Sequence, residues 1–303
     1  MDQEYFPKIF HTNPPYKMYV EQLGDKNSGN PSVVFIHGGY HTGFCYVQTP
    51  DGRPGWAPLI AQKGFNAYVT DVPDMGRSGS IPFEDVSGNF IVEAYVDFIK
   101  KLQKNVILIT HSMSGAFGYR IGELLPEQIE SIISIEPVLP GNLQDVIKPY
   151  FEAEGIIKAK LKQIEWIFDM NKYSYPPEQL IKSFLAGENS LFPNDKHSLA
   201  QYESSLQKIH PRLAYERLNI NNSQVRIDDF SKLKNIRCLV VTSSNNNVHI
   251  IDDKKIPETF RPFGIQVDHF MLGEMGIQGN NHMMMLEKNN EQILDLIIDW
   301  IKK

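Results

Sequence analysis

The amino-acid sequence predicts an α/β fold with a mostly parallel, doubly wound sheet and a helical insertion. Short, continuously apolar runs recur along the chain, which is the pattern of strands buried on both faces of a parallel sheet. Helical patterns separate several of these runs, and alternation of strand and helix is typical of a doubly wound sheet. Between residues 138 and 232 this rhythm stops, which indicates an insertion of a different kind.

The composition is that of an ordinary globular protein. The chain has 303 residues, of which 42% are hydrophobic and 22% are charged, so it can build a sizeable core. The net charge is −6 and no block of Lys and Arg occurs, so we expect neither nucleic acid nor an anionic membrane as a partner. The two cysteines, Cys45 and Cys238, have neither the spacing of a metal site nor that of a disulfide framework.

The beginning of the sequence bears on localisation. It lacks a basic segment followed by an apolar one, as a secretory signal would have. No apolar run approaches the ~18 residues that a membrane-spanning helix needs. We therefore expect a soluble, cytoplasmic protein. A secreted chain whose leader had been removed would look the same.

The predicted elements follow in order. Residues 17–24 are expected to supply a leading strand, and a last helix is indicated by apolar residues at i, i+3, i+4 and i+7 from Ile293 to Trp300. The strands in between are expected at 32–39, 66–73, 106–110, 131–137, 236–242 and 265–272, and the helices at 56–63, 91–104 and 115–125.

The segment between Glu136 and Ile236 has no strand-like run. Its apolar residues instead predict helices, one around residues 143–150, one around 164–168, and one that starts after Pro176-Pro177. The predicted domains are therefore a core of residues 1–137 and 233–303 and a helical lid of residues 138–232. The alternative is an ordinary peripheral layer of helices.

A serine lies where a buried strand meets a helix. In "VILITHSMSGAFGYR" (106–120), Ser112 follows an apolar strand and precedes a helical pattern. A nucleophilic serine in this position usually has small residues two before and two after it, because the turn is tight. Here these positions are held by Thr110 and Ser114, which are compact but are not glycine. The spacing alone leaves open whether Ser112 is a nucleophile or a helix N-cap.

His282 is the histidine placed best to act as a base. It follows the last strand and precedes the last helix, so its loop leaves the same edge of the sheet as Ser112. His37 and His111 directly adjoin other motif residues, and we expect them to be structural. For His11, His197, His210, His249 and His269 we expect no role in chemistry.

A histidine base needs a carboxylate to orient it. The loop after the strand at 236–242 reads Ser-Ser-Asn-Asn-Asn, and Asp252 and Asp253 lie too far beyond that strand end. Glu136 instead ends the apolar strand "SIISIEP" at the same predicted edge as Ser112 and His282. Glu136 is thus the predicted acid. The alternative is a solvated glutamate before a proline.

Taken together, these motifs make the chain resemble the α/β-hydrolase superfamily, and more narrowly a bacterial carboxylesterase subfamily with a Ser-Glu-His triad. The segments that carry the resemblance are "HGG", "TPDGRPGW", "DVPDMGRSG", "HSMSG", "SIEP" and "GNNHMMM". The resemblance implies the α/β-hydrolase fold, with Ser112 as nucleophile, His282 as base and Glu136 as acid. It also implies an oxyanion hole formed by backbone N–H groups of Gly39 or Tyr40 and of Met113.

The function that follows is hydrolysis of a small-molecule carboxylic ester through an acyl-serine intermediate, without a metal or organic cofactor. Phe44, Trp166 and Phe168 are candidates for lining the substrate pocket, with core packing as the alternative. The same triad would serve lactone or amide hydrolysis or acyl transfer. A non-catalytic small-molecule-binding protein is a further alternative. The sequence leaves the oligomeric state open, a homodimer included.

Overall fold

The computed structural model describes residues 7–25, 29–102, 105–161, 164–185, 189–245 and 252–303. Its centre is an eight-stranded sheet in the order β1-β2-β4-β3-β5-β6-β10-β11. The first two strands run antiparallel to their neighbours, and the pairs from β4 onward are parallel. The strands are β1 (Lys8–His11), β2 (Tyr19–Leu23), β3 (Ser32–Ile36), β4 (Asn66–Thr70), β5 (Val106–His111), β6 (Ile129–Ile135), β10 (Arg237–Thr242) and β11 (Val267–Met271).

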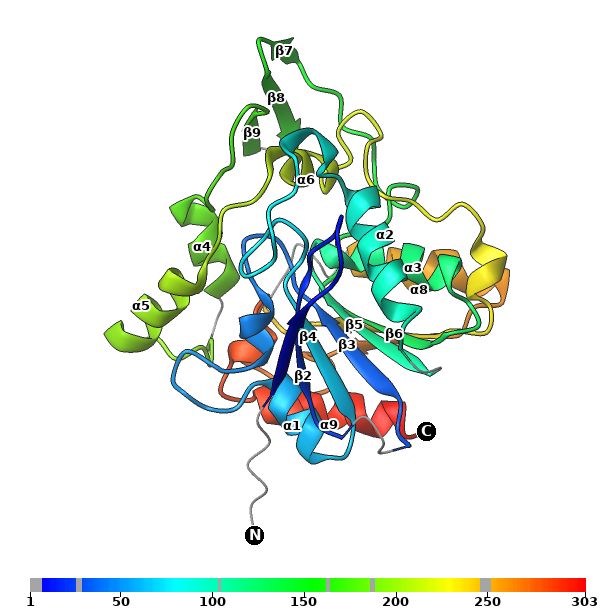
Figure 1. Ribbon diagram of the computed structural model, residues 1–303. Helices are drawn as coiled ribbons and strands as arrows, with labels where there is room; N and C mark the ends of the chain where they lie inside the picture. The colour runs from blue at the N-terminus through cyan, green and yellow to red at the C-terminus, as the bar shows by residue number, and fades with distance from the viewer. Residues whose placement is uncertain (1–6, 26–28, 103–104, 162–163, 186–188, 246–251) are drawn as a thin grey trace.

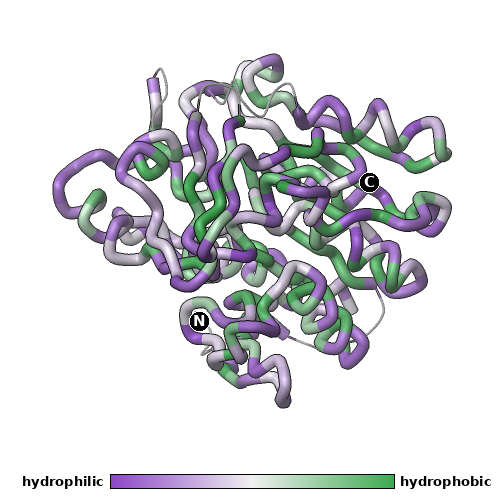
Figure 2. The backbone as a smooth tube through the Cα atoms, turned by 90° about the horizontal axis from the view of Figure 1, so that it is seen from above, coloured by the Kyte–Doolittle hydropathy of each residue, from purple (hydrophilic) through white to green (hydrophobic). Residues whose placement is uncertain are grey.

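Helices cover both faces of this sheet (Figure 1). Because successive strand residues point to opposite faces, Val34 and Leu108 join one hydrophobic cluster while Phe35 and Ile109 join the other. The first cluster contains buried side chains of α2 (Gly88–Ile99), α3 (Ser114–Leu124) and α8 (Lys255–Phe260), and the second those of α1 (Trp56–Gln62) and α9 (Asn290–Ile301). Seen from above, hydrophobic segments run through the middle of the molecule and hydrophilic ones mark many peripheral turns (Figure 2).

The predicted α/β architecture is confirmed. All seven predicted strands and the four predicted core helices are present, with ends shifted by a few residues. The additional edge strand β1 was not predicted. Its four residues are largely exposed, and so they lack the apolar run on which the prediction relied.

The insertion between β6 and β10 differs from its predicted secondary structure. It contains a three-stranded antiparallel sheet of β7 (Phe151–Ala153), β8 (Ile156–Leu161) and β9 (Ile164–Asp169). The helix expected around 164–168 is therefore wrong, and the structure also places no helix at 143–150. The helices found here are α4 (Glu178–Leu185), which does follow Pro176-Pro177, α5 (Lys196–Ser205) and α6 (Pro211–Glu216).

The alternation of side chains explains the missed hairpin. In β8, Ile157 and Ala159 are buried while Lys158 and Lys160 face outward to a greater extent. In β9, Phe168 is buried and Ile167 is 58% exposed. Alternation of buried and exposed side chains with a period of two is typical of a half-buried strand. The β-branched isoleucines of both segments also favour a strand. In Figure 1 the hairpin stands above α6, beyond the end of the central sheet.

No helix among the described residues is both long enough and apolar enough to cross a membrane.

Candidate active site

Ser112 lies at the carboxyl end of β5. It directly follows His111, the last residue of the strand, and α3 begins two residues later, at Ser114. Its φ of +52° is in the left-handed region, which non-glycine residues adopt infrequently and at a cost in free energy. The backbone carbonyl of Ser112 accepts hydrogen bonds from the N–H groups of Gly115 and Val138 at 2.9 and 2.7 Å. The surrounding backbone therefore holds this strained turn in place.

The two residues that replace the expected glycines are accommodated locally. The Thr110 methyl group packs against α3, where a Cβ built on Gly118 would lie only 2.7 Å from it. The Ser114 hydroxyl donates to the carbonyl of Ile36 at 2.8 Å and accepts from the N–H of His111 at 2.9 Å. Ser114 thus fastens the ends of β3 and β5 to the turn. Thr110 thus fits two residues before Ser112 because the residue that faces it in α3, Gly118, has no side chain.

Glu136 and His282 meet at the same edge of the sheet. The register of β5 and β6 pairs His111 with Ile135, so that the next residues, Ser112 and Glu136, leave neighbouring strands together. His282 Nδ1 lies 3.0 Å from Glu136 Oε2, and both side chains are at most 5% exposed. Glu136 also has a left-handed φ, +43°.

The other carboxylate oxygen of Glu136 is bound by the residue that follows β10. The N–H of Ser243 donates to Glu136 Oε1 at 2.8 Å, and the Ser243 hydroxyl donates to the same oxygen. No motif in the sequence indicates this role of Ser243. The residue after β10 is thus not an acid. It is a serine that binds Glu136, the acid that follows the neighbouring strand β6.

The imidazole of His282 is enclosed by two aromatic rings. His111 Nε2 lies 3.0 Å from the carbonyl oxygen of His282, with ring centroids 4.6 Å apart. From the insertion, Phe184 of α4 stacks on the His282 ring at a centroid distance of 5.0 Å. His111 precedes Ser112 directly, so the serine turn and the histidine loop are in contact.

A glycine turn after β3 reaches the serine turn. A Cβ on Gly38 would lie 2.9 Å from Ser112 Cβ and 2.8 Å from His111 Nδ1, so only glycine allows this approach. His37 anchors the turn, because its Nε2 accepts from the Val72 N–H at 2.9 Å and its Nδ1 contacts the Gly38 carbonyl. Burial lowers the pKa of His37, and the hydrogen bond that Nε2 accepts requires this nitrogen to be without a proton.

The carbonyl groups of the next two residues are also engaged. The Gly39 carbonyl lies 2.9 Å from His41 Nδ1, and the Tyr40 carbonyl accepts from the N–H of Gln207 at 2.7 Å. Burial lowers the pKa of His41 to about 3, so His41 is neutral and donates through Nδ1. Tyr40 has a φ of +66°. If a Cβ were built on Gly39, Met113 Sδ would lie 3.6 Å from it. Met113 is therefore close to Gly39 and Tyr40, the other two residues predicted for the oxyanion hole.

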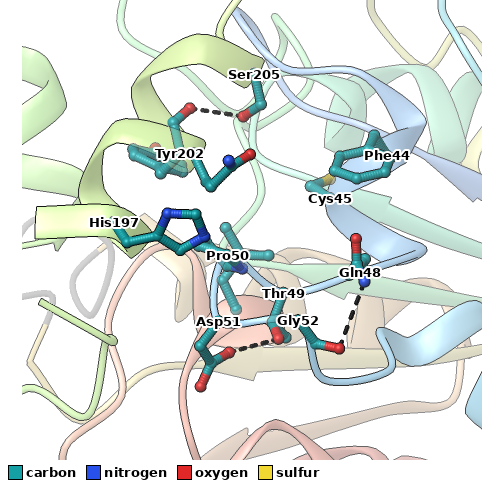
Figure 3. Close-up of a pocket in the computed structure, with 12 residues that line it drawn as sticks. Phe44, Cys45, Gln48, Thr49, Pro50, Asp51, Gly52, His197, Tyr202 and Ser205 are labelled. Carbon is teal, nitrogen blue, oxygen red and sulfur yellow. Dashed lines mark hydrogen bonds between the residues drawn. The ribbon is translucent and has the colours of Figure 1, made fainter. Parts of the chain in front are cut away.

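The predicted pocket residues do not form one group. Phe44 is 41% exposed and lines a separate cavity of about 330 Å³, formed by the 45–52 loop and by α5 (Figure 3). Cys45, Tyr202 and Ser205 also border it. Trp166 and Phe168 stack on each other in β9, and Phe168 shares a hydrophobic cluster with Tyr40 and Met113. Phe44 is thus apart from the other two.

The remaining candidates have structural partners. Asp252 forms an ion pair with Lys255, and Asp253 accepts a hydrogen bond from the Thr242 hydroxyl. His269 contacts the same hydroxyl at 2.8 Å. His210 caps α6, His11 contacts the Arg77 carbonyl, and His197 lines the cavity of Figure 3. His249 lies outside the described residues. Within the described ranges, no group of three or more His, Cys, Asp or Glu side chains could hold a metal ion.

Comparison with known proteins agrees with this architecture. The chain is 24% identical to a protein named "Probable secreted lipase phiG" from a fungal species (strain ATCC 74256), over 95% of this chain and 86% of that protein. It shares its fold with a structure described as a novel bacterial esterase, with a TM-score of 0.58, 17% identity and coverage of 98% and 93%. It also shares the fold of a serine hydrolase involved in carbazole degradation, with a TM-score of 0.62, 15% identity and coverage of 98% and 99%.

The profile described as "Alpha/beta hydrolase family" matches residues 33–296, which include the strands and turns described above and most of the chain. The chain therefore belongs to the alpha/beta hydrolase family.

Proposed function

We propose that the chain is a serine hydrolase that cleaves carboxylic esters, with Ser112 as nucleophile, His282 as general base and Glu136 as the acid that orients the base. The observation that supports this most is the 3.0 Å contact between His282 Nδ1 and Glu136 Oε2, at the strand edge from which Ser112 also emerges. A probable secreted lipase among the relatives points to the same class of substrate.

The chemistry begins with the tautomer of the base. Because Nδ1 of His282 faces a carboxylate, it carries the proton, and the lone pair of Nε2 is the one that accepts a further proton. In the proposed reaction, Ser112 Oγ attacks the acyl carbon and passes its proton to Nε2. The C=O electron pair moves to the oxygen, which becomes an oxyanion. Glu136 stabilises the imidazolium that forms, without taking the proton itself.

The oxyanion is proposed to accept hydrogen bonds from the backbone N–H of Met113 and of Gly39 or Tyr40. In a trans peptide the C=O of one residue points away from the N–H of the next. The Gly38 and Gly39 carbonyls are contacted by His37 and His41, which supports N–H groups of Gly39 and Tyr40 that point the other way, toward the reacting carbonyl. One such donor is typically worth roughly 10²–10³ in rate. Collapse of the oxyanion expels the alcohol with the proton from His282. Water activated by His282 then hydrolyses the acyl-serine by the same steps.

Residues 138–232 are proposed to act as a lid on this site. The stacking of Phe184 on His282 and the hydrogen bond of Gln207 to the Tyr40 carbonyl support this, because both bring the insertion against the predicted catalytic residues.

The test is turnover of p-nitrophenyl butyrate by the purified protein and two serine variants. Ser112→Ala should lower kcat by about 10⁴–10⁶-fold, as expected for loss of the nucleophile in a triad. Ser114→Ala should remain active, because its hydroxyl is used in contacts with Ile36 and His111, and should lose stability. Full activity of Ser112→Ala, or no ester turnover by the unaltered protein, would contradict the proposal.

A further inference from the structure

Arg217, which follows α6, is a buried cation. Its guanidinium contacts two aromatic rings, with Cζ 5.4 Å from the ring centroid of Tyr40 and 5.5 Å from that of Trp166. The residue is only 8% exposed, whereas arginine is rarely buried unless it is paired. Among the described residues, Nε and Nη2 have no hydrogen-bond partner, and no acidic side chain forms a salt bridge with Arg217.

Arg212, a neighbouring arginine, has the carboxylate partner that Arg217 lacks within the described residues. Arg212, in α6, donates through Nε to Glu216 Oε1 at 2.9 Å, and the Gly88 N–H donates to Glu216 Oε2 at 2.7 Å. Glu216 is the acidic residue next to Arg217 in sequence, and both of its oxygens are engaged. Contact with aromatic rings offsets only part of the cost of burying a guanidinium group. Arg217 therefore lacks the anion that a buried arginine ordinarily has.

The position of Arg217 relates it to the site proposed above. A Cβ built on Gly39 would lie 3.7 Å from Arg217 Nη1 and 3.6 Å from Met113 Sδ. The guanidinium thus adjoins the turn that we propose to hold the oxyanion. Nε1 of Trp166 is a further buried donor without a partner within the described part of the chain. Donors gathered beside a reacting carbonyl are suited to an oxygen anion on the same molecule.

We propose that Arg217 binds an acidic group of the substrate, so that the preferred esters carry a carboxylate. This rests on the proposed ester hydrolysis and narrows it. The planar fork of guanidinium N–H groups matches a carboxylate in shape and charge. A neutral substrate of equal length would leave the buried charge without a partner, and it would be bound less well.

The experiment compares matched substrates that differ in one charge. p-Nitrophenyl hydrogen glutarate carries a carboxylate on its acyl part, and p-nitrophenyl glutaramate replaces it with a neutral amide. 4-Acetoxybenzoate and 4-acetoxybenzamide form the corresponding pair with the group on the alcohol part. The unaltered protein should prefer the charged member of one pair, and that pair locates the acidic group.

Arg217→Gln should lower the charged-to-neutral ratio of kcat/KM by about 10-fold or more, since charge-assisted hydrogen bonds are lost. Arg217→Lys should lower it less, because it keeps the charge and loses the fork. Arg212→Gln removes a nearby charge, from α6, and should leave the ratio unchanged. If Arg217→Gln does not fold, as judged by its melting temperature, the ratio for Arg217→Lys decides. The proposal would be overturned if the Arg217 variant had the same charged-to-neutral ratio of kcat/KM as the unaltered protein in both substrate pairs.

A binding measurement separates this proposal from the proposed function. Calorimetric titration of the Ser112→Ala protein with glutarate should show binding that the additional change Arg217→Gln removes. If neither the charged nor the neutral esters are hydrolysed but glutarate binds through Arg217, the proposed function fails and the anion site stands. If neutral esters are hydrolysed while neither the ratio nor glutarate binding depends on Arg217, only the anion site fails.

Discussion

Phe184 stacks on His282 with its ring tilted by only 18° and the ring centroids 5.0 Å apart. The first residue belongs to the insertion and the second to the loop before α9, so this contact joins the two predicted domains. Phe184 also contacts His41, which holds the Gly39 carbonyl. One side chain of the insertion thus packs against two histidines of the candidate site.

The first prediction concerns this contact. Phe184→Ala removes the ring that restrains the His282 imidazole, and displacement of a catalytic group can cost up to about 10²-fold in rate. We therefore expect a fall in kcat for p-nitrophenyl butyrate. Phe192→Ala is the matched control, because Phe192 is a buried phenylalanine of the same insertion that packs on Tyr202. Each change should destabilise by about 3–5 kcal/mol, measured by urea unfolding. Equal loss of kcat in both folded variants would assign Phe184 a purely structural role.

The second prediction identifies the acid. Glu136→Gln should lower kcat by about 10⁴-fold, because the imidazole loses its carboxylate partner. Asp252→Asn should have little effect, since Asp252 pairs with Lys255 on the surface. Steady-state kinetics on both variants makes the comparison. A loss larger for Asp252→Asn than for Glu136→Gln would place the acid in the loop after β10.

The third prediction tests the glycine turn. In Gly38→Ala the new methyl group would lie 2.8 Å from His111 Nδ1 and 2.9 Å from Ser112 Cβ, so either the turn or the serine must shift. We expect kcat/KM to fall by about 10²-fold or more, with a cost of about 1–3 kcal/mol in unfolding free energy. Gly273→Ala, whose methyl group would meet its nearest atoms at 3.4 Å, should retain activity. Normal kinetics in Gly38→Ala would show that the turn does not position the reacting groups.

The fourth prediction concerns the pH dependence of stability. Burial raises the pKa of Glu287 to about 8, an effect that the charge of Arg53 opposes. Between the ordinary glutamate pKa and 8 the folded chain binds a proton that the unfolded chain has released, so this group makes stability fall as pH rises. Glu287→Gln keeps the neutral form at all pH values. The stability of the variant relative to the unaltered protein should therefore increase from pH 5 to pH 8, by at most about 5 kcal/mol.

Urea unfolding at several pH values measures this difference. A stability difference between Glu287→Gln and the unaltered protein that stays constant over the range would mean that Glu287 is ionised in the folded chain.

Most of the central sheet could be predicted because its inner strands, such as β3, β4 and β5, are buried on both faces. Runs such as residues 106–110 are apolar without interruption, and this pattern has few other interpretations. The hairpin of β8 and β9 was missed for the opposite reason. Its strands are buried on one face, so Ile157 and Ala159 alternate with lysines in β8 and give no continuous apolar run, while the apolar residues of β9 suggested a helix around 164–168.

The candidate site could be predicted where it depends on the ends of strands. Parallel strands end at one edge, so the order of the chain sufficed to bring Ser112 and Glu136 together. Partners that come from elsewhere could not be predicted in this way. Phe184 and Arg217 reach the site because the insertion packs against His282 and the Gly39 turn, and no local pattern in the sequence specifies that approach.

The most direct measurement is mass spectrometry of the acyl-enzyme. The protein is mixed with p-nitrophenyl acetate, quenched in acid within the first turnover, and digested to locate the acetyl group. The account predicts an acetyl ester on Ser112, which accumulates in the burst phase and is absent from Ser112→Ala. Acetyl found only on another residue, or ester hydrolysis with no acylated peptide together with full activity of Ser112→Ala, would contradict it.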